Sequence, residues 1–229
     1  TRYMTAALIY AAKIETIVEI GFGGGRTTWY LHKTLPKASI TAVELDPDVV
    51  DLAKKYFAIR EEENFRIVVQ DGRRYLADSK PKADVVMLDA YRGPFVPFHL
   101  LTEEFYRLVK QSLAPGGVVV QNVEPSTMLF DASVVTIKNV FDNVEAFDAD
   151  GNIVVVAYDG PAKTQQALLA RAIALQDTYK FRYPLDELVE DRRDGADLHK
   201  IIDPSVTPLV DDFAPTEALH AIEKHNRKW

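Results

Sequence analysis

Short apolar runs rich in β-branched residues alternate with stretches of helical periodicity along the first half of the chain. This alternation is typical of βαβ units and predicts a mostly parallel sheet covered by helices. The predicted strands are Thr16–Ile20, Ser39–Glu44, Phe65–Val69, Ala83–Leu88 and Val118–Val120.

One predicted helix, over Asp46–Phe57, has a clear start signal. Asp46 is a suitable N-cap residue, and Pro47 takes the first helical position, where its missing N–H costs nothing. The helical spacing of the apolar residues predicts one buried face, made of Val49, Leu52, Ala53, Tyr56 and Phe57.

A second predicted helix, over Thr102–Leu113, has signals at both ends. Thr102 is a suitable N-cap, and Ala114-Pro115-Gly116-Gly117 predicts a turn into the strand that follows. The sequence therefore predicts both the start and the end of this helix.

The alternation ends after Val120. A helix is predicted over Phe130–Phe141, and two short strands, Val144–Phe147 and Ile153–Ala157, flank the turn signal Asp148–Asn152. An antiparallel pair that closes a parallel sheet indicates a Rossmann-like, doubly wound α/β fold with seven strands, the last antiparallel. This is the arrangement of the methyltransferase fold.

The chain is expected to hold one catalytic domain with an appendage. We assign residues 1–160 to a nucleotide-binding catalytic domain and residues 161–229 to a helical or irregular extension of the same domain, with a helix near Thr164–Asp177. The start, Thr1-Arg2-Tyr3-Met4, shows neither an initiator methionine nor a signal peptide, which is compatible with a fragment of a longer chain.

Composition excludes several classes of function. The 229 residues carry a formal net charge of −7, which argues against a nucleic-acid groove. No apolar run reaches the roughly 20 residues of a membrane span. The absence of cysteine excludes disulfides and thiolate chemistry and fits a reducing compartment, so we expect a cytoplasmic protein. None of the five histidines has metal-ligand spacing, and no metal is expected.

The run Glu19-Ile20-Gly21-Phe22-Gly23-Gly24-Gly25 directly follows the first predicted strand. Glycines here let the backbone turn sharply and approach a ligand at a helix N-terminus. A dinucleotide fingerprint beginning at Gly21 would need glycine where Arg26 stands. The pattern acidic-x-Gly-x-Gly-x-Gly fits instead, with Glu19, Gly21, Gly23 and Gly25, and it is typical of folds that bind S-adenosylmethionine.

Three further acidic residues lie at the ends of successive predicted strands. Glu44 stands about 20 residues beyond the glycines, where a carboxylate can bind both ribose hydroxyls. Asp71, followed by Gly72, occupies the position where this fold contacts adenine, and Asp89 faces the expected reaction centre. Ligands of such sheets bind beyond the carboxyl ends of the strands, so these residues predict one nucleotide site.

Three segments resemble a known family. Leu88-Asp89-Ala90-Tyr91-Arg92-Gly93, Leu101-Thr102-Glu103-Glu104-Phe105-Tyr106-Arg107-Leu108 and Leu113-Ala114-Pro115-Gly116-Gly117 are similar to the spermidine synthase family of polyamine aminopropyltransferases. The resemblance covers roughly residues 1–160. It implies an adenosyl donor, either S-adenosylmethionine or its decarboxylated form, a small amine acceptor and a homodimer.

The sequence departs from the family at two positions of the chemistry. Gly24 stands where the family has an aspartate that holds the donor amine, and Arg92 stands where it has the aspartate that deprotonates the acceptor. Arginine is not a base at neutral pH and repels a protonated polyamine. Within these 229 residues we expect no counterpart of the family's N-terminal β-hairpin domain. We therefore expect nucleotide binding and weak or absent activity on putrescine.

Other residues are candidates for the missing functions. Asp89 is the first candidate for orienting the donor or taking a proton, Tyr91 for lining an acceptor pocket, and His99 for replacing the base. Packing of the loop on the sheet is an equally good explanation for the aromatic residues that follow Asp89. Asp211 and Asp212 resemble a motif of spermidine synthase-like tails that reaches the mouth of the site, and capping of a C-terminal helix explains them equally well.

Three functions remain open at this point. The first is transfer of an aminopropyl group, or of a modified analogue, to an amine. The second is methyl transfer on the same fold, for which Arg26 or Arg92 would pair with the carboxylate of the intact donor. The third is a non-catalytic nucleotide-binding module, since the sequence does not guarantee a positioned base.

Overall fold

The structure of the chain is a computed structural model, which describes residues 2–93, 95–127, 129–149, 151–198 and 200–212. The histidines at 199, 220 and 225, and the part of the acidic motif that follows residue 212, lie outside the described residues. No described helix is long and apolar enough to cross a membrane.

One mixed sheet of eight strands organises the molecule, in the order β3-β2-β1-β4-β5-β7-β6-β8. The strands are β1 (Thr16–Ile20), β2 (Ser39–Glu44), β3 (Phe65–Val69), β4 (Ala83–Leu88), β5 (Leu113–Val123), β6 (Asn143–Ala149), β7 (Asn152–Tyr158) and β8 (Arg192–Arg193). The first five strands are parallel, and β7 is antiparallel to both β5 and β6. The predicted α/β fold, its parallel half and its closing hairpin are confirmed, and the two-residue β8 adds an eighth strand antiparallel to β6.

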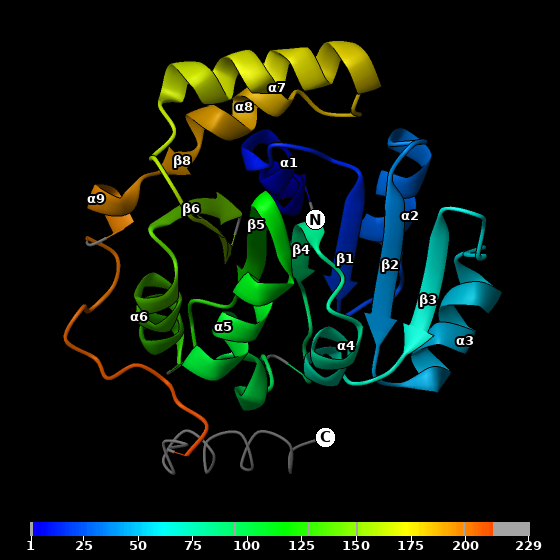
Figure 1. Cartoon of the computed structure of the whole chain (residues 1–229), viewed down its shortest axis with the longest axis horizontal. Helices are drawn as coiled ribbons and strands as arrows, with labels where there is room; N and C mark the ends of the chain where they lie inside the picture. Colours follow the sequence, from blue (N-terminus) through cyan, green and yellow to red (C-terminus); the bar gives the residue numbers. More distant parts are fainter. Residues whose placement is uncertain (1, 94, 128, 150, 199, 213–229) are drawn as a thin grey trace.

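Helices cover both faces of this sheet (Figure 1). The first face carries η1 (Arg2–Ala6), α1 (Ala7–Tyr10), α2 (Arg26–Thr34), α3 (Pro47–Tyr56), α7 (Gln165–Tyr179) and α8 (Leu185–Glu190). The second face carries α4 (Gly72–Ser79), α5 (Glu103–Ser112), α6 (Phe130–Val140) and α9 (Gly195–Leu198), and η2 (Phe98–Leu100) precedes α5. Two apolar cores therefore form, one on each side of the sheet.

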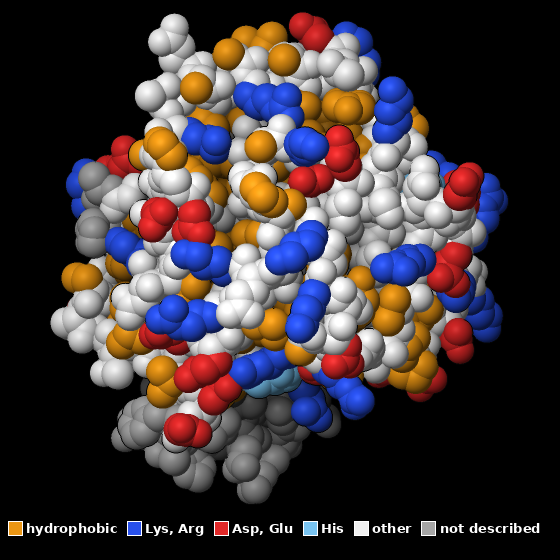
Figure 2. All heavy atoms as spheres, viewed as in Figure 1, with side chains coloured by type: hydrophobic (Ala, Val, Ile, Leu, Met, Phe, Trp, Pro, Cys, Tyr) orange, Lys and Arg blue, Asp and Glu red, His pale blue; other side chains and the backbone are white. Residues whose placement is uncertain are grey.

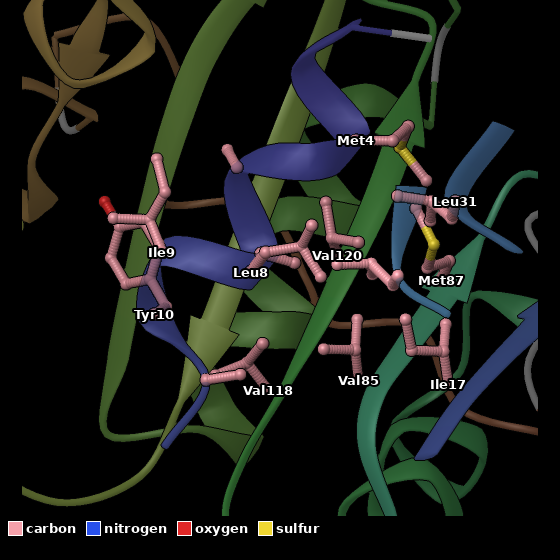
Figure 3. Packing of buried hydrophobic residues seen from close by; sticks show 14 of the residues in the cluster. Met4, Leu8, Ile9, Tyr10, Ile17, Leu31, Val85, Met87, Val118 and Val120 are labelled. Carbon is pink, nitrogen blue, oxygen red and sulfur yellow. The ribbon is translucent and has the colours of Figure 1, made fainter. Parts of the chain in front are cut away.

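The N-terminal segment is part of the first core (Figure 3). Met4 and Leu8 are almost completely buried and lie against β1, β4 and β5, where they meet buried residues such as Ile17, Met87 and Val120. Burial of each such side chain contributes about 1.5–3 kcal/mol. Residues 2–10 are thus a structural part of the domain.

The predicted helix caps are present. The side chain of Asp46 accepts a hydrogen bond from the Asp48 amide at the start of α3, and that of Thr102 accepts one from the Phe105 amide at the start of α5. Thr164 caps α7 in the same way. These bonds satisfy helix N–H groups that have no partner within the helix.

Two local predictions are wrong. On α3 the buried residues are Val50 and Ala53, while Leu52, Tyr56 and Phe57 from the predicted buried face are more than half exposed. The reason is that α3 covers the edge of the sheet at β2 and β3, so only a narrow stripe of the helix meets the sheet.

The second wrong prediction is the turn over residues 114–117. These residues belong to β5, which pairs with β4 at Leu113 and again from Val118 onward, with a register shift between Ala83 and Val85. Glycine is needed at 117, because a Cβ there would lie 2.8 Å from the Ala83 carbonyl oxygen. The Gly–Gly pair thus bends a continuous strand close to its neighbour.

The segment after residue 160 contacts the sheet through a buried charged group. Glu145 of β6 is 3% exposed and forms an ion pair with Arg192 of β8. It also accepts hydrogen bonds from the hydroxyls of Tyr10 and Tyr158. The division of the chain at residue 160 stays a prediction, and the Glu145 cluster joins both parts to one sheet.

Candidate functional site

The carboxyl ends of the parallel strands β1 to β4 meet at one edge of the sheet, at the lower side of Figure 1. Basic, acidic and histidine side chains gather at this edge in Figure 2. All ten predicted site residues lie in or directly beside the loops that follow these strands.

The glycine loop Gly21–Gly25 leaves β1 in close contact with the end of β4. Gly21 has a φ of +94°, and a Cβ on it would lie 2.5 Å from the Cα of Ala90 and from the carbonyl oxygen of Asp89. Only glycine fits there. Gly25, with a φ of +67°, occupies the N-cap position of α2.

The carboxylate of Glu44 binds the glycine loop. Its Oε2 accepts hydrogen bonds from the amides of Phe22 and Gly23, at 3.1 and 3.0 Å, and its Oε1 accepts one from the amide of Asp46 at 3.1 Å. The structure therefore brings together the two parts of the predicted site, the glycine loop and the acid that follows β2. The helix-capping role belongs to Asp46 alone.

These bonds bear on ligand binding. A carboxylate offers about four acceptor positions, and backbone amides take three of those of Glu44. A ribose diol, with two donors, would therefore have to displace at least one amide. Leu45, which follows Glu44, is 65% exposed and gives this part of the edge an apolar surface.

Asp71 has two partners at the start of α4. Its Oδ1 accepts a hydrogen bond from the Arg74 amide at 2.9 Å, which caps the helix, and its Oδ2 lies 3.0 Å from Nε2 of His99. Partial burial acts to raise the pKa of Asp71, but the bonds from Arg74 and His99 outweigh it and lower this pKa. Asp71 is therefore a carboxylate at neutral pH.

Gly72 has a packing role next to Asp71. A Cβ on this residue would lie 2.1 Å from Cγ2 of Ile20 in β1. The missing side chain lets the first turn of α4 press against the end of β1, which fixes the position of Asp71 relative to the glycine loop.

The described end of the chain reaches the same edge. Arg73 of α4 donates two hydrogen bonds to the carboxylate of Asp211, at 2.7 and 2.5 Å, and one to the carbonyl oxygen of His99 at 3.1 Å. The hydroxyl of Thr102 also donates to Asp211, at 2.7 Å. Asp211 thus connects α4 to the start of α5, and Arg73 connects both to the His99 loop, while Asp212 is exposed.

Asp89 lies at the end of β4 beside Asn122 of β5. Its Oδ1 accepts a hydrogen bond from the Asn122 side-chain amide at 3.0 Å, and burial raises the pKa of Asp89 although this bond acts to lower it. The hydroxyl of Tyr91 donates to the carbonyl oxygen of Asn122 at 3.0 Å. Burial first, and then the charge of Asp89, raise the pKa of Tyr91.

Glu19 lies beneath the glycine loop. It is 2% exposed, and its Oε2 has no hydrogen-bond partner among the described residues. Burial, and then the nearby charge of Asp89, raise the pKa of Glu19 well above its ordinary value. The acidic position of the glycine motif is therefore a buried carboxyl group that favours its protonated form.

The two positions that depart from the family pattern are exposed. Gly24 lies on the outer side of the glycine loop. The Arg92 side chain points to solvent from a tight turn, in which its amide donates to the carbonyl oxygen of Phe95 at 2.8 Å. Gly24 and Arg92 therefore supply no carboxylate in place of the two aspartates that the family pattern has at these positions.

The site divides into two groups. Glu44, Glu19 and Asp89 surround the glycine loop, whereas His99 bonds to Asp71 and has no hydrogen bond to Asp89 among the described residues. Contact of any of them with a donor stays a prediction. Sequence reasoning missed Leu45 and Asn122. Asn122 is a polar residue near the end of β5, and polar residues at strand ends are the signal used for the other site residues. This signal was missed because the strand was predicted to end at Val120 and not at Val123.

Within the described residues, no group of three or more histidine, aspartate or glutamate side chains is arranged to hold a metal ion.

Comparisons with known proteins place the chain in a family. Residues 4–158 match the spermine/spermidine synthase domain. The polyamine aminopropyltransferase of Vibrio vulnificus is 31% identical over 224 residues, which cover 95% of this chain and 74% of that protein.

Solved structures give two kinds of neighbour. A spermidine synthase in complex with the transition-state analogue AdoDATO has a TM-score of 0.71 at 20% identity, covering 88% of this chain and 73% of that one. Human methyltransferase-like protein 13 in complex with SAH has a TM-score of 0.69 at 25% identity, covering 79% and 90%. The same fold is thus shared by a spermidine synthase and a methyltransferase-like protein.

Proposed function

The chain belongs to the spermine/spermidine synthase domain family, and from this membership we propose that it is a transferase that binds an adenosyl sulfonium donor beside the glycine loop. The donor is S-adenosylmethionine or decarboxylated S-adenosylmethionine, and the group transferred is of the aminopropyl type, with an amine as acceptor. The observation that carries the proposal is the Glu44 carboxylate held by the Phe22 and Gly23 amides.

The adenosyl half of the donor would lie along the ends of β2 and β3. Glu44 would accept the ribose hydroxyls after releasing an amide, and the exposed Leu45 side chain would contact the adenine ring. Asp71, kept ionised by its bonds to Arg74 and His99, would accept a hydrogen bond from the adenine amino group. Neighbouring structures with AdoDATO and SAH support an adenosyl compound as the ligand.

The transfer step requires a nucleophile and a base. The lone pair of the acceptor amine attacks the carbon bonded to sulfur, a C–N bond forms, and the C–S electron pair returns to sulfur, leaving a neutral thioether. The acceptor nitrogen must lose a proton. Asp89 is suited to take it, because burial raises the pKa of Asp89 and makes its carboxylate a stronger base, while Asn122 fixes its position.

Putrescine is a poor acceptor in this proposal. Arg92 carries a positive charge at the position where the resemblance predicts the catalytic aspartate, and it repels a diammonium substrate. We expect weak or absent spermidine formation.

Methyl transfer is the second candidate, and Gly24 favours it. Without a carboxylate at Gly24, nothing in the glycine loop favours the amine of a decarboxylated donor over the carboxylate of the intact one. The structural neighbour in complex with SAH is named a methyltransferase-like protein.

Calorimetry with intact and decarboxylated S-adenosylmethionine, followed by mass spectrometry of products from a mixed amine panel, tests both candidates. A mass gain of an aminopropyl group supports the first, and a gain of a methyl group supports the second. Binding of neither donor would overturn the proposal, and binding without any product would indicate a non-catalytic module.

A homodimer, which the family resemblance implies, is also proposed. Sedimentation velocity tests it, and a monomer at micromolar concentration would contradict it without affecting the proposed donor site.

A further inference from the structure

A cavity of about 730 Å³ lies on the outer side of the glycine loop and runs along α2. Its walls come from four separate segments: the N-terminus, the glycine loop with α2, the segment after α3, and the connection between α7 and α8. This volume is within the ~300–1,000 Å³ of small-molecule sites. Glu44, Asp71 and Asp89 do not line it.

The charged residues that line the cavity are all basic. They are Arg2, Arg26, Lys33 and Arg182, and no carboxylate is among the described lining residues. The chain as a whole has a formal net charge of −7, so the basic lining is a local feature.

Two of the four cations have carboxylate partners. Arg2 lies 3.8 Å from Glu187 and 3.6 Å from Asp191, and Lys33 lies 2.7 Å from Glu62. These ion pairs neutralise part of the positive charge and connect neighbouring segments of the cavity wall.

The other two cations, Arg26 and Arg182, are exposed and make no ion pair with a carboxylate of the described chain. The Arg182 guanidinium lies over the ring of Tyr30, 5.3 Å from the ring centre, and its backbone amide donates to the Tyr30 hydroxyl at 2.9 Å. Cation–π attraction to the ring holds the guanidinium in place, and its N–H groups can bind an anion at the same time.

Aromatic rings, together with Ile59, supply the apolar part of the lining. Trp29, Tyr30, Phe57 and Tyr183 face the cavity, and Phe57 is 61% exposed although it is a large apolar side chain. Such a lining suits a planar ring, because rings gain contact area with little loss of conformational entropy.

Gly24 forms the junction between the cavity and the glycine loop. A Cβ here would meet only the Phe57 ring, at 3.7 Å, which is an ordinary contact, and φ of Gly24 is not in the left-handed region. The backbone therefore does not require glycine at this position. Glycine at position 24 leaves the cavity open next to the loop, and it adds no negative charge there.

We propose that this cavity is a second ligand site, which binds a planar aromatic anion carrying a carboxylate or a phosphate. The aromatic walls hold the ring, and Arg26 and Arg182 bind the anionic group. The ligand has the opposite charge to a polyamine. The cavity borders the proposed donor site at Gly24 and Arg26, but Glu44, Asp71 and Asp89 do not line it, so its occupancy does not depend on binding of the adenosine part of the donor.

The test uses pairs of probes with similar rings and different charge. Trp229→Phe leaves Trp29 as the only tryptophan, so that quenching of its fluorescence reports occupancy of the cavity. We expect 4-hydroxyphenylacetate or phenyl phosphate to quench Trp29 saturably, and tyramine, the cationic counterpart of the first, to quench it at least about tenfold more weakly. The stronger of the two anions identifies the preferred group.

Three variants localise the effect. Arg26→Gln and Arg182→Gln each remove one charge and should weaken anion binding about tenfold, while Lys37→Gln removes one charge from an exposed position outside the cavity and should leave it unchanged. Gly24→Asp, which the backbone accommodates, should weaken anion binding and strengthen tyramine binding.

Circular dichroism and the affinity for adenosine, which lacks the amino-acid tail, show whether each variant is folded and whether the adenosine part of the donor site is intact. Equal binding of tyramine and the anions would overturn the proposal. So would the absence of saturable quenching by either anion, or equal losses in Arg26→Gln and Lys37→Gln.

Discussion

The glycine loop contributes to two surfaces of opposite charge. On one side the amides of Phe22 and Gly23 bind the Glu44 carboxylate, with Asp89 nearby at the end of β4. On the other side Gly24 and Arg26 line a cavity whose charged residues are all basic. Five consecutive residues therefore separate a surface suited to a sulfonium donor from one suited to an anion.

The two surfaces are also built differently. The acidic one consists of single residues at strand ends, each held by backbone amides or by a neighbouring strand. The basic one is assembled from segments as distant in sequence as Arg2 and Arg182. The first depends on the order of the strands in the sheet, whereas the second depends on how α7 and α8 pack on the N-terminus.

The largest expected effect concerns Asp89 on the acidic side. Asp89→Asn keeps the shape of the side chain but removes the base, so the rate of transfer should fall about 10²–10⁴-fold. Affinity for S-adenosylhomocysteine should change little, which separates chemistry from binding. A variant with the full rate of product formation would remove Asp89 from the mechanism.

A smaller effect is expected for Glu44, which defines the acidic side of the loop. Glu44→Ala removes the proposed bonds to the ribose hydroxyls, each worth about 1.5–3 kcal/mol, so calorimetry should show at least about a tenfold loss of donor affinity. Asp46→Ala is the matched control, because Asp46 caps α3 and should affect stability alone. Equal affinities in the wild type and in folded Glu44→Ala would contradict the donor site.

The smallest effect concerns the pH dependence of stability and tests the buried acid under the loop. Since burial raises the pKa of Glu19, the folded state holds a proton that the unfolded state releases, and stability falls as pH rises from the ordinary carboxyl pKa toward the raised one. Glu19→Gln should remove this slope, which is about 1.4 kcal/mol per pH unit for one proton.

Urea unfolding across this pH range measures the slope. Glu15→Gln, a change to an exposed glutamate of the same part of the chain, is the control and should keep the wild-type profile. The same slope in Glu19→Gln as in the wild type would show that Glu19 is ionised in the folded protein.

Most of the fold could be predicted because its signals are local. The first four strands have the predicted bounds, and Asp46 and Thr102 cap their helices as expected. The exposed face of α3 could not be predicted, because the spacing of apolar residues does not show that a helix lies at the edge of a sheet.

The parts of the candidate site that depend on the order of the strands could be predicted, and the parts that depend on loops could not. Glu44 lies on the glycine loop as expected because the order of the strands brings the ends of β1 and β2 together. The Asp71–His99 contact and the tether at Asp211 could not be predicted, since they depend on the path of a loop and of the C-terminal segment. The basic cavity was hidden for the same reason, although Arg26 itself stood out in the sequence.

The buried Glu145 cluster has a consequence for biosynthesis. Glu145 leaves the ribosome well before Arg192, its ionic partner, while the Tyr10 and Tyr158 hydroxyls are neutral donors. A buried carboxylate without its partner costs about 3–5 kcal/mol. The nascent chain therefore cannot bury Glu145 of β6 in its final form until residues beyond 190 have emerged, so we expect the antiparallel half of the sheet to be completed late in translation or after release.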